Sequence, residues 1–107
     1  MTDFDPDRIR TRLVEVGEEW AELDAAANVL EETRKTILAE IMLKCEGSQA
    51  AKEMQALADP SYKLHVTKMV AARKEANRAK VKFETGKMWA ELMRTRESTR
   101  RAEATIR

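Results

Sequence analysis

The residues of this 107-residue chain that could do chemistry are mostly cations on one segment. Ten lysines and arginines fall between residues 73 and 101, and only four glutamates separate them. The ten are Arg73, Lys74, Arg78, Lys80, Lys82, Lys87, Arg94, Arg96, Arg100 and Arg101. Cations spread along a helix longer than about 60 Å, at 1.5 Å per residue, can follow a phosphate backbone or lie on an acidic protein surface. We take these ten residues as the candidate nucleic-acid-binding face.

The two halves of the chain carry opposite charge. Residues 1–46 hold twelve acids and six bases, which is −6, and residues 47–107 hold seven acids and fourteen bases, which is +7. Either the halves attract each other as antiparallel partners, or the basic half meets an anion, and the two explanations are compatible. If the first explanation is complete, the cations only balance the acidic half.

Other reactive residue types give no catalytic pattern. His65 is the single histidine, and we interpret it as a packed residue or as one at the wet edge of the core, because no nucleophile with an orienting carboxylate accompanies it. One cysteine, Cys45, and one histidine cannot form a zinc cluster. An acidic cluster lacks the Glu-x-x-His motif of metal-binding bundles; it comprises Glu18, Glu19, Glu22 and Asp24. We therefore expect no enzyme, no catalytic residue, no metal and no cofactor.

The element that must position the cations is a long helix. Residues at alternating steps of three and four share one helical face from 62 to 93. This core stripe of residues 62–93 is Tyr62, His65, Met69, Ala72, Ala76, Ala79, Phe83, Gly86, Ala90 and Met93. Its middle is small, so a second helix can approach closely.

A matching face precedes it in the chain. The core stripe of residues 9–41 is Ile9, Leu13, Val16, Trp20, Leu23, Ala27, Leu30, Arg34, Ile37 and Ile41. Asp5-Pro6 and Asp59-Pro60 are helix-start signals, and Gly47 suits a helix end. We predict helices over about 6–46, 49–58 and 60–103 in a single domain, 1–107. The fold class is all-α, an antiparallel hairpin of two long helices with a short connecting helix.

Complementary sizes suggest how the two long helices align. Placing Ile41 level with His65 sets Leu23 against Phe83 and lets Trp20 fill the gap at Gly86. We expect this register because large residues then mostly oppose small ones.

The remaining apolar residues bear on the connection and on assembly. Ser48 can cap the short helix, with Met54 and Leu57 as its apolar contacts. Outer apolar residues lie away from both core stripes; they are Val14, Ala21, Val29, Val70, Val81, Met88 and Leu92. Either the hairpin bends to bury them or two chains pair along them, so both monomer and homodimer stay open.

The chain shows no signal for a membrane. No apolar run is long enough to cross a bilayer, and the first residues, MTDFDPDRIR, have no signal-peptide core. We expect a cytoplasmic protein without a membrane partner.

Two segments resemble small helical proteins encoded by phages and prophages. They are RKTILAEIMLKCEGSQAAKE and ARKEANRAKVKFETGKMWAELMRTRESTRRAE, within residues 34–103. Some of these proteins act as anti-CRISPR proteins. The resemblance implies an accessory or inhibitor protein that binds nucleic acid or a CRISPR-type nucleoprotein complex in a bacterial host. No site residues carry over, because no motif aligns.

The leading hypothesis is therefore a non-enzymatic phage-type protein whose basic helix binds nucleic acid, with single-stranded DNA favoured. Tyr62, Phe83 and Trp89 are the aromatic residues available for base stacking. The rival hypothesis is a helical adaptor that binds proteins and whose basic face only pairs with its acidic helix.

Overall fold

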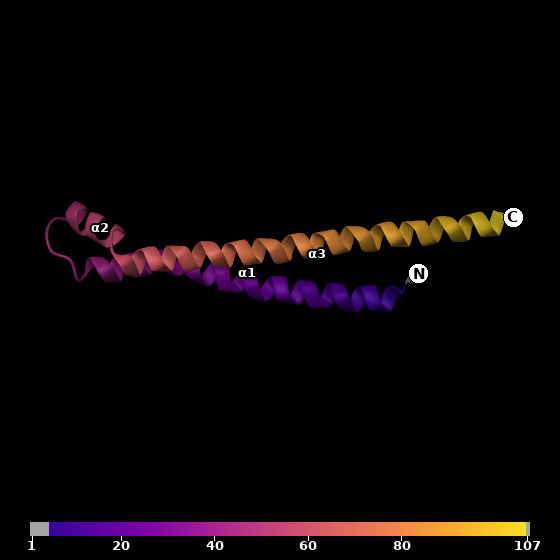
Figure 1. Cartoon of the computed structure of the whole chain (residues 1–107), viewed down its shortest axis with the longest axis horizontal. Helices are drawn as coiled ribbons and strands as arrows, with labels where there is room; N and C mark the ends of the chain where they lie inside the picture. The colour runs from indigo at the N-terminus through magenta and orange to yellow at the C-terminus, as the bar shows by residue number, and fades with distance from the viewer. Residues whose placement is uncertain (1–4, 107) are drawn as a thin grey trace.

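The computed structural model describes residues 5–106 and contains three helices. They are α1 (Pro6–Met42), α2 (Gln49–Leu57) and α3 (Pro60–Ile106). The two long helices lie antiparallel in a rod of 84 × 19 × 19 Å, with α2 at the end where the chain turns back (Figure 1). The predicted all-α hairpin with a short connecting helix is confirmed.

The predicted caps begin the helices. Asp5, Ser48 and Asp59 each accept a hydrogen bond from a backbone N–H two or three residues further on. These bonds satisfy donors that have no partner inside the helix.

Two helix ends differ from the prediction. α1 ends at Met42 and not near residue 46, because the N–H groups of Lys44 and Cys45 donate to carbonyls three residues back and tighten the chain into a turn. Gly47 follows outside the helix with a φ of 112°. α3 runs beyond residue 103 to Ile106, because no glycine or proline interrupts its last turns.

The two core stripes face each other and form the core. All ten residues of the stripe of residues 62–93 are buried or half-buried, and in the stripe of residues 9–41 only Arg34 is exposed. The predicted buried faces are thus confirmed. The core is thin, because five of the seven buried residues in the described part of the chain are alanines and no large side chain is fully buried.

The predicted register is wrong by about one heptad. A Cβ added to Gly86 would lie 3.1 Å from Cδ2 of Leu13, so Leu13 and not Trp20 occupies this gap. Phe83 occupies the gap at Gly17 in the same way, 3.1 Å from an added Cβ. Trp20 instead packs on Phe83, with ring centroids 5.6 Å apart. Sliding a heptad repeat by seven residues leaves the same residues pointing inward, so the stripes alone do not select the register.

The short helix α2 packs mainly against α1. The prediction that Met54 and Leu57 make this contact is wrong, since both are exposed and Ala56 is fully buried. The small side chain of Ala56 allows the two helices to lie close together. The side chain of Gln55 also donates to the carbonyl of Glu46 at 2.9 Å, which ties α2 to the turn before it.

The outer apolar residues defined above are all exposed in the single chain. The hairpin therefore does not bury them by bending, and pairing of two chains is the alternative that stays open. Within residues 5–106, no helix combines the length and apolar character needed to cross a membrane.

Candidate nucleic-acid interface

The ten predicted cations all lie on α3, and their partners divide them into three groups. Among the ion pairs of residues 5–106, those that reach α1 come from Arg73. Arg78, Arg100 and Arg101 pair with acids of α3 itself. The other six form no ion pair with a described residue; they are Lys74, Lys80, Lys82, Lys87, Arg94 and Arg96.

Arg73 is a clamp between the two long helices. Its guanidinium donates to both carboxylate oxygens of Glu31 at 2.8 and 2.9 Å. It also donates to Asp24 and to Asn28, each at 2.6 Å. The bond from Arg73 lowers the pKa of Glu31, and the bonds to Glu31 and then Asp24 raise the pKa of Arg73. Because these bonds occupy its guanidinium, we leave Arg73 out of the nucleic-acid-binding face.

Three of the unpaired cations share the side of α3 on which Arg73 lies. Lys80, Lys87 and Arg94 follow Arg73 at intervals of seven residues, which places them along one side of the helix. All three are exposed. A surface cation without a carboxylate partner is available to an anion, so this side is the best candidate for phosphate contacts.

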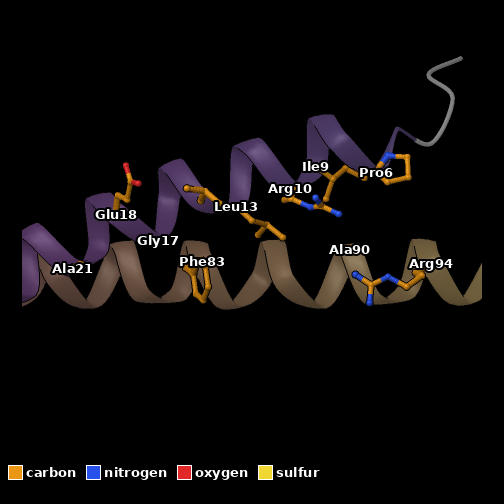
Figure 2. Close-up of a pocket in the computed structure, with 11 residues that line it drawn as sticks. Pro6, Ile9, Arg10, Leu13, Gly17, Glu18, Ala21, Phe83, Ala90 and Arg94 are labelled. Carbon is orange, nitrogen blue, oxygen red and sulfur yellow. The ribbon is translucent and has the colours of Figure 1, made fainter.

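An apolar groove opens on the same side, between the ends of α1 and α3 that lie far from α2 (Figure 2). It has a volume of about 770 Å³, and its apolar lining includes Ile9, Leu13 and Phe83. Arg10 and Arg94 lie toward the same end of the groove (Figure 2). Cations beside an apolar surface suit a ligand with an anionic part and a flat apolar part, such as a nucleotide.

Arg10 was not among the predicted residues, because it lies in the acidic half of the chain. The available signal was the segment DRIRTRL, in which three arginines alternate with other residues. In an antiparallel hairpin the first turns of α1 must lie beside the later part of α3. Arg10 therefore joins the basic side of α3 even though its own half has a negative net charge.

The three aromatic residues considered for base stacking have different environments. Tyr62 is buried and accepts a hydrogen bond from Arg34 at 3.4 Å. Phe83 is half-buried and lines the groove of Figure 2. Trp89 is 58% exposed and lines a second groove, which Arg8 also lines. Of the three, only Phe83 is beside the cations proposed for phosphate contacts.

The other reactive residues have structural partners. His65 lies with Nε2 2.8 Å from the carbonyl oxygen of Leu30, and since a carbonyl can only accept, Nε2 carries the proton. The thiol of Cys45 donates to the carbonyl of Ile41 at 3.3 Å. In the acidic cluster, Asp24 is bonded to Arg73. Across residues 5–106, no group of three or more acidic, histidine or cysteine side chains is gathered that could hold a metal ion.

Comparisons of the chain with models of protein families, with curated proteins and with solved structures found no match. The fold and the chemistry of the described residues are therefore the basis for a function.

Proposed function

We propose that this chain is a non-enzymatic protein that binds nucleic acid through exposed cations of α3, with single-stranded DNA as the favoured ligand. One observation carries the proposal. If the basic half only balanced the acidic half, its cations would pair with α1, but among the described ion pairs only those of Arg73 do so. The exposed cations next to Arg73 are therefore open to an external polyanion.

The geometry suggests how a strand would lie. Lys80, Lys87 and Arg94 follow one another along α3 at intervals of about 10 Å, at 1.5 Å per residue. Arg94, the last of the three, lines the groove of Figure 2. Phosphates would contact this line, and Arg10 would add a further cation at the groove. The groove offers an apolar surface and the ring of Phe83 to one base. Only an unpaired base can enter it, which favours a single strand over a duplex.

The resemblance to phage-encoded proteins supplies a setting for this proposal. A chain that binds a displaced single strand could act on a nucleoprotein complex of the bacterial host, including a CRISPR-type complex, in the host cytoplasm. This setting is part of the proposal, and its support is the resemblance of residues 34–103.

The test is the affinity of the whole chain for a fluorescent single-stranded oligonucleotide, measured over a series of salt concentrations. We expect Arg10→Gln combined with Arg94→Gln to weaken binding roughly tenfold, at about 0.7 kcal/mol for each surface cation. The slope of log K against log salt should fall by about 1.4, or about 0.7 for each lost phosphate contact.

A matched control is available on the opposite side of both helices. Arg8→Gln combined with Arg96→Gln removes the same charge from the same two helices but away from the groove of Figure 2. We expect this variant to keep most of the affinity. Equal losses in the two variants would mean that net charge and not the groove determines binding. Absence of binding by the wild type at low salt would reject nucleic-acid binding and leave the adaptor hypothesis.

A further inference from the structure

The side of the hairpin opposite the groove of Figure 2 carries its own stripe on each long helix. Steps of three and four residues align these positions. The stripe on α1 is Arg8, Arg12, Glu15, Glu19, Glu22 and Ala26. The stripe on α3 is Arg78, Lys82, Thr85, Trp89, Leu92 and Arg96. We call this surface the Trp89 flank; Arg8, Arg12, Glu15 and Trp89 line one groove on it.

We infer that a second copy of this chain covers the Trp89 flank. Two hairpins would then form a four-helix bundle in which α1 of each copy lies beside α3 of the other. The inference is independent of the proposed function, because it concerns the other side of the molecule.

The exposed area of the single chain supports a partner. The chain exposes 8626 Å², whereas a folded monomer of 12.2 kDa exposes about 6,100 Å². The excess is therefore about 2,500 Å². A stable interface of standard size needs about 800 Å² from each partner. One such interface on each chain fits within the excess.

The composition of the Trp89 flank supports the same partner. Trp89 is 58% exposed and Leu92 is 44% exposed. Two grooves meet at Trp89, one lined also by Leu13 and Met93 and the other by Leu92. An exposed tryptophan between apolar grooves is typical of the anchor of an interface. Trp89 and Leu92 would add apolar contacts beside the thin alanine core described above.

Charge selects how the two copies align. On the Trp89 flank, α1 presents Glu15, Glu19 and Glu22, whereas α3 presents Arg78 and Lys82. Because Leu13 lies against Gly86 and Phe83 against Gly17, these acidic and basic segments lie at the same height of the rod. A two-fold axis along the rod places α1 beside the partner's α3 and joins opposite charges. An axis across the rod would place α1 beside α1 and bring the glutamates together.

On the opposite side of the rod, two carboxylates of α1 are already paired within the chain. There the Arg73 clamp already pairs the carboxylates of Asp24 and Glu31 within one chain. On the Trp89 flank, Glu19, Glu22 and Lys82 have no described ion pair. The Trp89 flank, where glutamates of α1 and cations of α3 lie at the same height without a described bond between them and a tryptophan is exposed, is thus the side that a second copy completes.

The first test is the molar mass of the chain by light scattering at micromolar concentration. We expect the wild type to have twice the mass of one 12.2 kDa chain. Trp89→Glu should shift the mass to that of one chain. Val14→Glu is the matched control, because Val14 is 53% exposed but lines the groove of Figure 2, on the side opposite the Trp89 flank. This control should remain a dimer.

The second test uses two charge-reversed chains. One carries Glu19→Lys and Glu22→Lys, and the other carries Arg78→Glu and Lys82→Glu. Each chain alone brings like charges together across the interface and should be a monomer. An equimolar mixture should regain the mass of two chains, because each variant's α1 then faces the opposite charge on the other's α3. Pairing within a chain cannot explain this recovery, since each chain is repulsive within itself.

Several results would overturn the inference. A wild type with the mass of one chain, or of more than two, contradicts a two-fold dimer. A Trp89→Glu variant that stays dimeric places the interface on another surface. Charge-reversed chains that dimerise alone, or stay monomeric when mixed, contradict the alignment of α1 with the partner's α3. DNA affinity enters none of these measurements, so failure of the proposed function leaves them interpretable.

Discussion

The two ends of the rod are held together by different forces. In the closed half, near α2, the described hydrogen bonds and ion pairs between the long helices join residues 24–34 to residues 62–73. In the open half, residues 6–21 contact residues 83–94 through Leu13 in the gap at Gly86 and Phe83 in the gap at Gly17. Apolar grooves lie on both sides of this open contact.

We therefore assign the register of the two long helices to the closed half, and binding to the open half. Directional bonds such as those of Arg73 and His65 are satisfied in one alignment, so the closed half determines which heptad faces which. The open half has apolar grooves on both sides and fewer described polar bonds between the helices, which is typical of regions that bind ligands or partners. The single-strand site and the dimer surface that we propose both include the open half.

The largest effect that we expect from a single change in the open half is that of Gly86→Leu. The new side chain would overlap Leu13, which already lies 3.1 Å from an added Cβ. Overpacking of this kind costs about 1–3 kcal/mol. Urea unfolding followed by circular dichroism, at one fixed protein concentration, measures it.

The partner of Gly86 can be identified in the same experiment. Leu13→Ala combined with Gly86→Leu should recover part of the loss, because the new leucine then occupies the vacated volume. Trp20→Ala combined with Gly86→Leu should lower the free energy of unfolding by at least the sum of the two separate losses. Rescue by Trp20→Ala instead would support a register shifted by one heptad and contradict the packing of the open half.

The sequence predicted the buried faces well, because a 3-4 repeat determines which residues point inward in any register. It did not predict the register itself. Trp20 against Gly86 and Leu13 against Gly86 both place a large residue on a glycine, so complementarity of size does not distinguish the two registers. The bonds that distinguish the two alignments are made by His65, which lies in the core stripe, and by Arg73, which the sequence indicated to be a surface cation.

The candidate site was predicted in part. The ten cations were found because they cluster in sequence, but their partners depend on which side of α3 each occupies. Asp24 and Glu31 are seven residues apart and so lie on the same side of α1. This spacing indicated that both carboxylates could bind one cation of α3. Arg10 and the groove depend on two segments about 80 residues apart in sequence, and their contact follows only from the register.

A smaller effect is expected when the clamp of the closed half is removed. Arg73→Gln leaves the carboxylates of Asp24 and Glu31 without their cation, and we expect a loss of stability smaller than that of Gly86→Leu, because all three side chains are partly exposed to solvent. Arg101→Gln is the matched control, since Arg101 pairs only with Glu97 on its own helix among the described ion pairs. Equal losses in the two variants would show that the clamp adds nothing beyond an ordinary surface pair.

The smallest expected effect is the pH-dependent part of the stability that Arg73 provides. Arg73 lowers the pKa of Glu31 from its ordinary value of 4.5, so the unfolded chain binds this proton more readily than the folded one. The resulting stabilisation is complete above pH 4.5 and is lost as the pH falls through the lowered pKa. We therefore expect the urea midpoints of wild type and Arg73→Gln to differ most near neutral pH and to converge well below 4.5. Glu97, whose pKa the bond from Arg100 lowers, is present in both proteins and largely cancels in the difference. If the difference between the two urea midpoints stays constant or increases in acid, Arg73 stabilises the closed half by packing and not through Glu31.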